Sequence, residues 1–128
     1  MDIQTVGAVL YWCEGSKRED DRRVEFVNSD PRMISVFMRY LRTKNIDERR
    51  IRARITLHVQ DNETRCTEYW KEVATLNDSS FISTVMKDPS VSKKPLPYGT
   101  IAIRYNSLQL LREIKKEISD IAEETSAT

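Results

Sequence analysis

The sequence predicts an α+β domain in which helices cover one face of a mixed or antiparallel sheet. Two segments, residues 50–59 and 98–105, alternate apolar and polar residues in the way that half-buried strands do. Other segments repeat apolar residues at helical spacing and begin or end at capping residues. Because the connections between them are short, one layer of helices on one sheet is the economical arrangement.

A first helix is expected over residues 3–13, where apolar residues recur at helical spacing before Glu14 and the terminating Gly15. Two small residues, Gly7 and Ala8, lie in the middle of this helix. Since Gly inside a helix costs about 1 kcal/mol relative to Ala, its presence here indicates a close backbone approach.

A strand over residues 23–27 and a second helix are expected next. The segment NSDP (28–31) begins the helix, because its Ser or Asp can cap it and its Pro needs no hydrogen bond at the first helical position. The helix has an apolar face and is expected to stop near Lys44.

The remaining elements complete a single domain over residues 1–122, followed by a frayed tail over 123–128. The expected elements are a helix around Cys66–Val73, an extended segment at 80–87, a proline-rich loop at 88–97, the strand 98–105 and a last helix from Ser107 to Ile121.

The strand over residues 50–59 has the most informative pattern. Its odd-numbered residues are apolar and are expected to face the core, whereas its even-numbered residues face the other side. That second row consists of Arg50, Arg52, Arg54, Thr56 and His58. An outward row of arginines suits contacts to phosphate or guanine. The alternative is that these arginines pair across strands with Glu25 or other acids and simply keep the face soluble.

Charge is unevenly distributed along the chain, although the net charge is only +1, from 21 basic and 20 acidic residues. Residues 42–54 contain six basic residues and two acids, whereas residues 113–124 contain five acids and two lysines. A near-neutral total argues against a nucleic-acid binder, but a segregated distribution does not.

Several other classes of protein are not expected. No stretch approaches the roughly 20 apolar residues of a membrane span. The start of the chain lacks the basic region of a secretory signal, so an intracellular, cytoplasmic location is expected. Cys13 and Cys66 are expected to be small buried hydrophobes, since two cysteines and His58 cannot form a zinc cluster on their own.

Two residues are candidates for chemistry. Glu14 lies at a helix C-terminus, where the helix dipole disfavours an anion and a hard cation such as Mg²⁺ would relieve the penalty. The alternative is a solvent-exposed side chain. His58 is either a general base or an ordinary surface residue at the end of its strand.

Residues 7–15 (GAVLYWCEG) resemble a degenerate LAGLIDADG helix, the signature of homing endonucleases. The segments EGSK (14–17), NSDP (28–31) and LPYG (96–99) resemble those of small bacterial and archaeal proteins assigned to that group. The resemblance extends over nearly the whole chain. It implies the homing endonuclease-like order α-β-β-α-β-β-α, with the helix around Cys66–Val73 as an insertion.

The resemblance also implies a homodimer that binds double-stranded DNA. Motif helices of two domains pack through small residues in that family, which implies an interface at Gly7, Ala8 and Tyr11. The sheet contacts the DNA there, which implies DNA-binding roles for Arg50, Arg52, Arg54, Thr56, His58 and Arg104. The last acid of the motif helix binds metal, which implies that Glu14 is a catalytic residue and ligand in cleavage that depends on Mg²⁺ or Mn²⁺.

The chain departs from the motif at two positions. Val9 stands where the motif has its packing Gly, and Glu14 stands where the usual residue is Asp. The alternative function is therefore a non-catalytic regulatory or protein-interaction domain on the same fold, whose arginines pair internally or contact an acidic partner.

Overall fold

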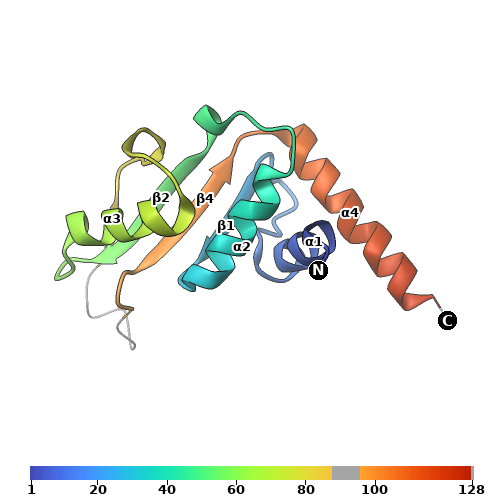
Figure 1. Cartoon of the computed structure of the whole chain (residues 1–128), viewed down its shortest axis with the longest axis horizontal. Coiled ribbons are helices and arrows are strands. Elements are labelled where there is room, and N and C mark those ends of the chain that lie inside the picture. The colour runs from blue at the N-terminus through green and yellow to red at the C-terminus, as the bar shows by residue number, and fades with distance from the viewer. Residues whose placement is uncertain (88–95, 128) are drawn as a thin grey trace.

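The computed structural model describes residues 1–87 and 96–127, arranged as an α+β fold (Figure 1). The helices and strands are α1 (Ile3–Glu14), β1 (Val24–Asn28), α2 (Pro31–Arg42), β2 (Arg52–His58), α3 (Glu63–Ala74), β3 (Val85–Lys87), β4 (Thr100–Tyr105) and α4 (Leu108–Ser126). Short 3₁₀ turns at Glu48–Arg50 and Asp78–Ser80 precede β2 and β3.

The four strands form one mixed sheet in the order β1-β4-β2-β3. Strand β4 pairs antiparallel with both β1 and β2, whereas β3 pairs parallel with β2. Figure 1 shows α2 and α3 in front of the strands, with α1 beside α2 and α4 running away from the end of β4. The predicted α+β class and the mixed sheet are confirmed.

The element boundaries differ from the expected ones in several places. Between α1 and α2 the structure has a single strand, β1, as the sequence pattern predicts, and an isolated bridge between Gly15 and Phe26. The resemblance to homing endonucleases implies two strands at this point. Helix α4 continues to Ser126 and so includes part of the expected tail. In the expected loop at 88–97, residues 88–95 lie outside the described part of the chain.

The core lies between the helices and one face of the sheet. Val24 and Phe26 of β1 are fully buried there, and the ring of Phe26 stacks on that of Phe37 in α2 with 4.4 Å between centroids. In β2 the predicted alternation is confirmed, because Ala53, Ile55 and Leu57 are buried while the residues between them are half-buried.

Helix α1 buries a different face from the one that its apolar spacing suggests. Gly7 and Ala8 are buried, and a Cβ atom on Gly7 would lie 2.0 Å from Cγ of Tyr40 in α2. Val9 and Trp12 are exposed by 37% and 44%. The close approach at Gly7 is therefore that of an aromatic ring within the same chain.

Capping contacts mark the start of α2 and the end of α3. Asp30 caps α2 by accepting a hydrogen bond from the backbone N–H of Arg32 (2.8 Å), and Pro31 is the first helical residue. At the C-terminus of α3, Arg42 donates to the carbonyl oxygens of Ala74 (3.0 Å) and Thr75 (2.8 Å). Thr75 itself has a left-handed conformation with φ 54°.

Helix α4 is fixed to the C-terminal end of α2 and the residues after it by a partly buried polar cluster. The Tyr40 hydroxyl donates to Oε1 of Glu117 (2.8 Å), and the Lys44 ammonium pairs with the other oxygen of the same carboxylate. The Lys44 side chain is only 6% exposed and also donates to Oε1 of Gln4 in α1 (3.0 Å).

Among the described residues, no helix is long and apolar enough to cross a membrane.

Candidate nucleic-acid interface

The face of the sheet opposite the helices is formed by rows of residues that the strand register places side by side. Glu25 of β1 pairs with Arg104 of β4, which pairs in turn with Arg52 of β2. The next row contains Val27, Ala102 and Arg54. Further along β2, Thr56 and His58 lie beside Val85 and Lys87 of β3. We call this surface the open face.

Arg52 and Arg54 make their hydrogen bonds to backbone carbonyls. The Nη1 group of Arg52 donates to the carbonyl oxygens of Arg49 (2.7 Å) and Ile51 (2.9 Å), and Nε of Arg54 donates to that of Ser83 (3.1 Å). Within residues 1–87 and 96–127, neither guanidinium lies within 4.0 Å of a carboxylate. Among the described residues, no acid therefore compensates the positive charge of either arginine on the open face.

Arg104 is different because Glu25 neutralises it. Its Nε donates to Oε2 of Glu25 at 2.6 Å, and the Glu25 side chain is only 12% exposed. The same carboxylate lies 3.5 Å from Nη2 of Arg23 and 3.6 Å from Nη2 of Arg18. Cross-strand pairing with Glu25 thus applies to Arg104 and does not extend to Arg52 or Arg54.

Arg50 does not belong to the row in which the sequence pattern placed it. It lies in the 3₁₀ turn before β2, because Asp47 caps that turn by accepting from the backbone N–H of Arg49 (3.0 Å). The Arg50 guanidinium stacks 4.7 Å from the ring centroid of Tyr105 and donates to the carbonyl of Asn106. It is exposed but is used for packing.

Thr56 and His58 are half-buried on the open face. The backbone N–H of His58 donates to Oδ2 of Asp61 (2.9 Å), which fixes the turn after β2. Its ring atom Nδ1 is buried without a hydrogen-bond partner among the described residues.

Glu14 is the last residue of α1 and is exposed. The bridge between Gly15 and Phe26 holds this end of the helix beside β1, and the Lys17 ammonium donates to the carbonyl of Cys13 (2.9 Å). No group of three or more His, Cys, Asp or Glu residues in the described part of the chain could hold a metal ion. Among these residues, Glu14 is therefore not part of a preformed set of protein ligands for a divalent ion.

The expected interface residues Gly7, Ala8 and Tyr11 are buried in the chain's own core. Gly7 contacts Tyr40, and the Tyr11 hydroxyl accepts a hydrogen bond from the backbone N–H of Glu25 (3.1 Å). In this chain these three residues are therefore covered by α2 and the sheet, and the interface implied for them stays a prediction.

The exposed side of α1 includes Val9, Trp12 and Cys13 instead. The exposure of Cys13 also corrects its predicted burial, whereas Cys66 is buried as expected. Burial raises the pKa of the Cys66 thiol.

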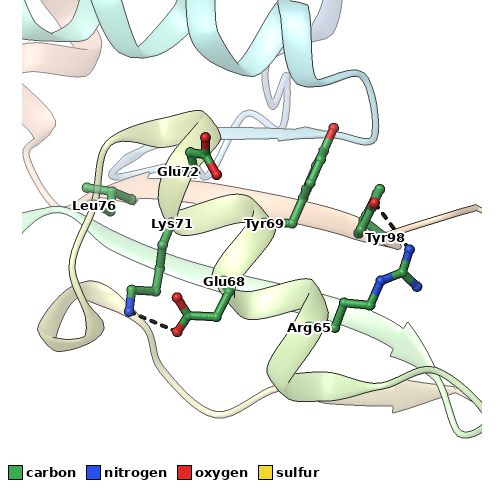
Figure 2. Close-up of a pocket in the computed structure, with 7 residues that line it drawn as sticks. All are labelled: Arg65, Glu68, Tyr69, Lys71, Glu72, Leu76 and Tyr98. Carbon is green, nitrogen blue, oxygen red and sulfur yellow. Dashed lines mark hydrogen bonds and ion pairs between the residues drawn. The ribbon is translucent and has the colours of Figure 1, made fainter.

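A groove over α3 was not anticipated from the sequence (Figure 2). It measures about 460 Å³, and the rings of Tyr69 and Tyr98 stack within it, 3.6 Å between centroids. Arg65 lies 4.9 Å from the centroid of the Tyr98 ring and donates to its hydroxyl (3.2 Å), while Lys71 pairs with Glu68 (3.1 Å). The contacts of Tyr69 and Arg65 with Tyr98 anchor α3 to the residues just before β4.

A second hollow, of about 410 Å³, lies between the loop that precedes β1 and the junction of β4 with α4. Its lining residues are Arg18, Asp20, Asp21, Arg22, Arg23 and Asn106. The sequence signal for it is the charged run SKREDDRR (16–23), which composition alone identifies only as a loop. We call it the arginine hollow.

Comparison of the chain with profiles of known protein families, with curated proteins and with solved structures finds no match. The fold and the site define an α+β protein whose sheet has one face covered by helices and one open face, on which two arginines have no acidic partner in the described part of the chain.

Proposed function

We propose that this protein binds double-stranded DNA through the open face of its sheet. The observation that supports the proposal most directly is that Arg52 and Arg54 occupy alternate positions of β2 on that face and have no carboxylate partner in the described residues. Guanidinium groups match phosphate oxygens and guanine edges bidentately, and phosphate contacts supply most of the affinity for DNA.

The chemistry of the open face favours a duplex over a single strand. Proteins that bind single strands stack bases on aromatic side chains. In the described part of the sheet, the residues that share the open face are charged, hydroxylic, small or aliphatic, apart from His58, and none is Phe, Tyr or Trp. A surface with several arginines and a single half-buried imidazole suits a regular phosphate backbone better than a row of unstacked bases.

Replacing both Arg52 and Arg54 by Ala tests the proposal. We expect duplex affinity at low salt to fall at least about tenfold, and the slope of log affinity against log salt to fall by about one to two. The matched control is Arg32→Ala with Arg39→Ala, which removes the same charge from exposed positions on α2, on the helix side of the sheet. Equal losses in both variants, or no duplex binding by the unmodified protein, would overturn the proposal.

Homodimerisation and cleavage are separate proposals that rest on the resemblance to homing endonucleases. A second copy that packs on α1 would contact Val9, Trp12 and Cys13. Light scattering at the mass of one chain would exclude that dimer.

The cleavage proposal predicts that the protein nicks supercoiled DNA with Mg²⁺ or Mn²⁺ and that Glu14→Gln abolishes the nicking. Nicking that persists in this variant would show that Glu14 takes no part in the reaction.

A further inference from the structure

The loop over residues 16–23 has a fixed shape because it folds around one buried carboxylate. The Asp21 side chain is only 1% exposed and accepts hydrogen bonds from the Ser16 hydroxyl (2.6 Å) and from the backbone N–H (3.0 Å) and Nε (3.1 Å) of Arg18. The backbone N–H of Ser16 also donates to the carbonyl of Glu25 in β1 (3.0 Å). The loop is thus attached to the edge of the sheet.

This loop adds arginines to the cation-rich end of the open face. Arg18 and Arg23 both pair with Glu25, the carboxylate that also neutralises Arg104. Three guanidiniums therefore contact one carboxylate, although Arg18 also pairs with Asp21 at 3.1 Å. Arg52, which has no acidic partner among the described residues, lies next to Arg104 in the same row. The positive charge at this end exceeds what the neighbouring acids compensate.

The arginine hollow opens at the same end. Of its two acidic lining residues, Asp21 is already bound by Ser16 and Arg18, and Asp20 is exposed. Arg22 is exposed and has no ion pair with any described residue. Together with the side-chain amide of Asn106, the arginines give the hollow several hydrogen-bond donors that face solvent.

We propose that the arginine hollow binds a phosphate group of the nucleic acid that lies on the open face. The inference rests on the proposed function and extends it to a loop outside the sheet. Guanidinium groups bind phosphate oxygens in pairs, and amide groups donate to them as well. Because Arg18 and Arg23 contact Glu25 at the end of the row that contains Arg52, one duplex can engage both surfaces.

The test combines Arg22→Gln with Arg23→Gln and measures duplex binding by fluorescence anisotropy. We expect affinity to fall about tenfold and the salt slope to fall by about one to two, with the Arg32→Ala and Arg39→Ala control unchanged. Asn106→Asp is a second variant that places a negative charge in the hollow and leaves the 16–23 loop as it is. It is expected to weaken binding similarly.

A parallel measurement uses inorganic phosphate, titrated against chloride at equal ionic strength, with amide NMR signals of residues 18–23 and 106 as the readout. Phosphate-specific shifts that vanish in the double variant support the site. If the unmodified protein binds duplex and both variants bind it equally well, the hollow is not a phosphate site, although the proposed function stands. If duplex binding is absent, shifts with inorganic phosphate still assign the hollow to free phosphate, and their absence overturns it.

Discussion

Gly7 of α1 lies so close to Tyr40 of α2 that a Cβ atom at Gly7 would be 2.0 Å from Cγ of the ring and 2.4 Å from its Cβ. These are the atoms nearest the α2 backbone, so the ring cannot move aside by a simple change of rotamer. The absence of a side chain at Gly7 therefore sets how closely the two helices pack.

Substituting Gly7→Ala is expected to destabilise the fold. The clash should cost about 1–3 kcal/mol, and the roughly 1 kcal/mol of helix propensity that Ala gains offsets only part of this. The free energy of unfolding, measured with denaturant, should fall and Tm with it. Val9→Ala, at an exposed position of the same helix, is the control and should change little. A Gly7→Ala protein at least as stable as the unmodified one would contradict the packing described here.

Tyr40 is expected to make stability fall at alkaline pH. Burial, and the hydrogen bond to Glu117, raise the pKa of Tyr40 far above its usual value, which is about 10 in the unfolded chain. The contribution of the protonated Tyr40 hydroxyl to stability is therefore complete below about pH 10. It is lost as pH rises above this value, because Tyr40 then ionises in the unfolded chain before it does so in the folded one. Tyr40→Phe should lower the free energy of unfolding at neutral pH by about 0.5–1.5 kcal/mol. Above pH 10, the stability of this variant should fall less steeply with pH than that of the unmodified protein. Denaturant titrations at neutral and alkaline pH measure both stabilities. Equal pH dependence of the two proteins above pH 10 would contradict the prediction.

Asp21 is expected to have the opposite pH dependence. Hydrogen bonds from Ser16 and Arg18 hold the pKa of the Asp21 carboxyl below its usual range. Its contribution to stability is then complete above about pH 4, the unfolded value, and is lost as pH falls through the lowered folded value. Asp21→Asn should cost about 1–3 kcal/mol at neutral pH, and the difference from the unmodified protein should shrink below pH 4. If the difference in stability does not change with pH, the charge of the Asp21 carboxylate does not contribute to stability and the prediction is wrong.

Thr75→Gly is expected to stabilise the protein. Thr75 adopts a left-handed conformation, φ 54° and ψ 54°, which costs a residue with a Cβ about 1–2 kcal/mol. Glycine removes that cost but loses more conformational entropy on folding, so a net gain of about 0.5–1 kcal/mol is expected in thermal unfolding. Thr64→Gly, at an exposed position inside α3, is the control and should destabilise, since its helical conformation is one that Thr adopts without strain. Loss of stability in both variants would contradict the prediction.

Local chemistry made some elements of this fold predictable. The start of α2 follows from the NSDP segment, because a capping Asp and a first-turn Pro act on neighbouring residues alone. The buried row of β2 likewise follows from alternation within one strand. Alternation alone predicts that β2 begins at Arg50, but the strand begins at Arg52 because the Asp47 cap of the preceding turn competes with it.

Long-range packing decided what the sequence pattern could not. The buried face of α1 depends on Tyr40, 33 residues after Gly7, so the apolar spacing of α1 identified the helix but not the face it buries. In the candidate site, the pairing of Arg104 with Glu25 joins residues 79 apart and requires the strand order β1-β4-β2. The arginine hollow also depends on this topology, since it brings Asn106 to the 16–23 loop.

The parallel strand β3 has a consequence for how the protein behaves in concentrated solution. With only three residues, Val85–Lys87, it covers part of the edge of β2, whose free N–H and C=O groups would otherwise form a template for pairing with another chain. Val85 and Met86 are themselves partly exposed. If β3 detaches, an apolar strand and an open edge are uncovered together, so this corner of the sheet is where self-association through added strands would begin.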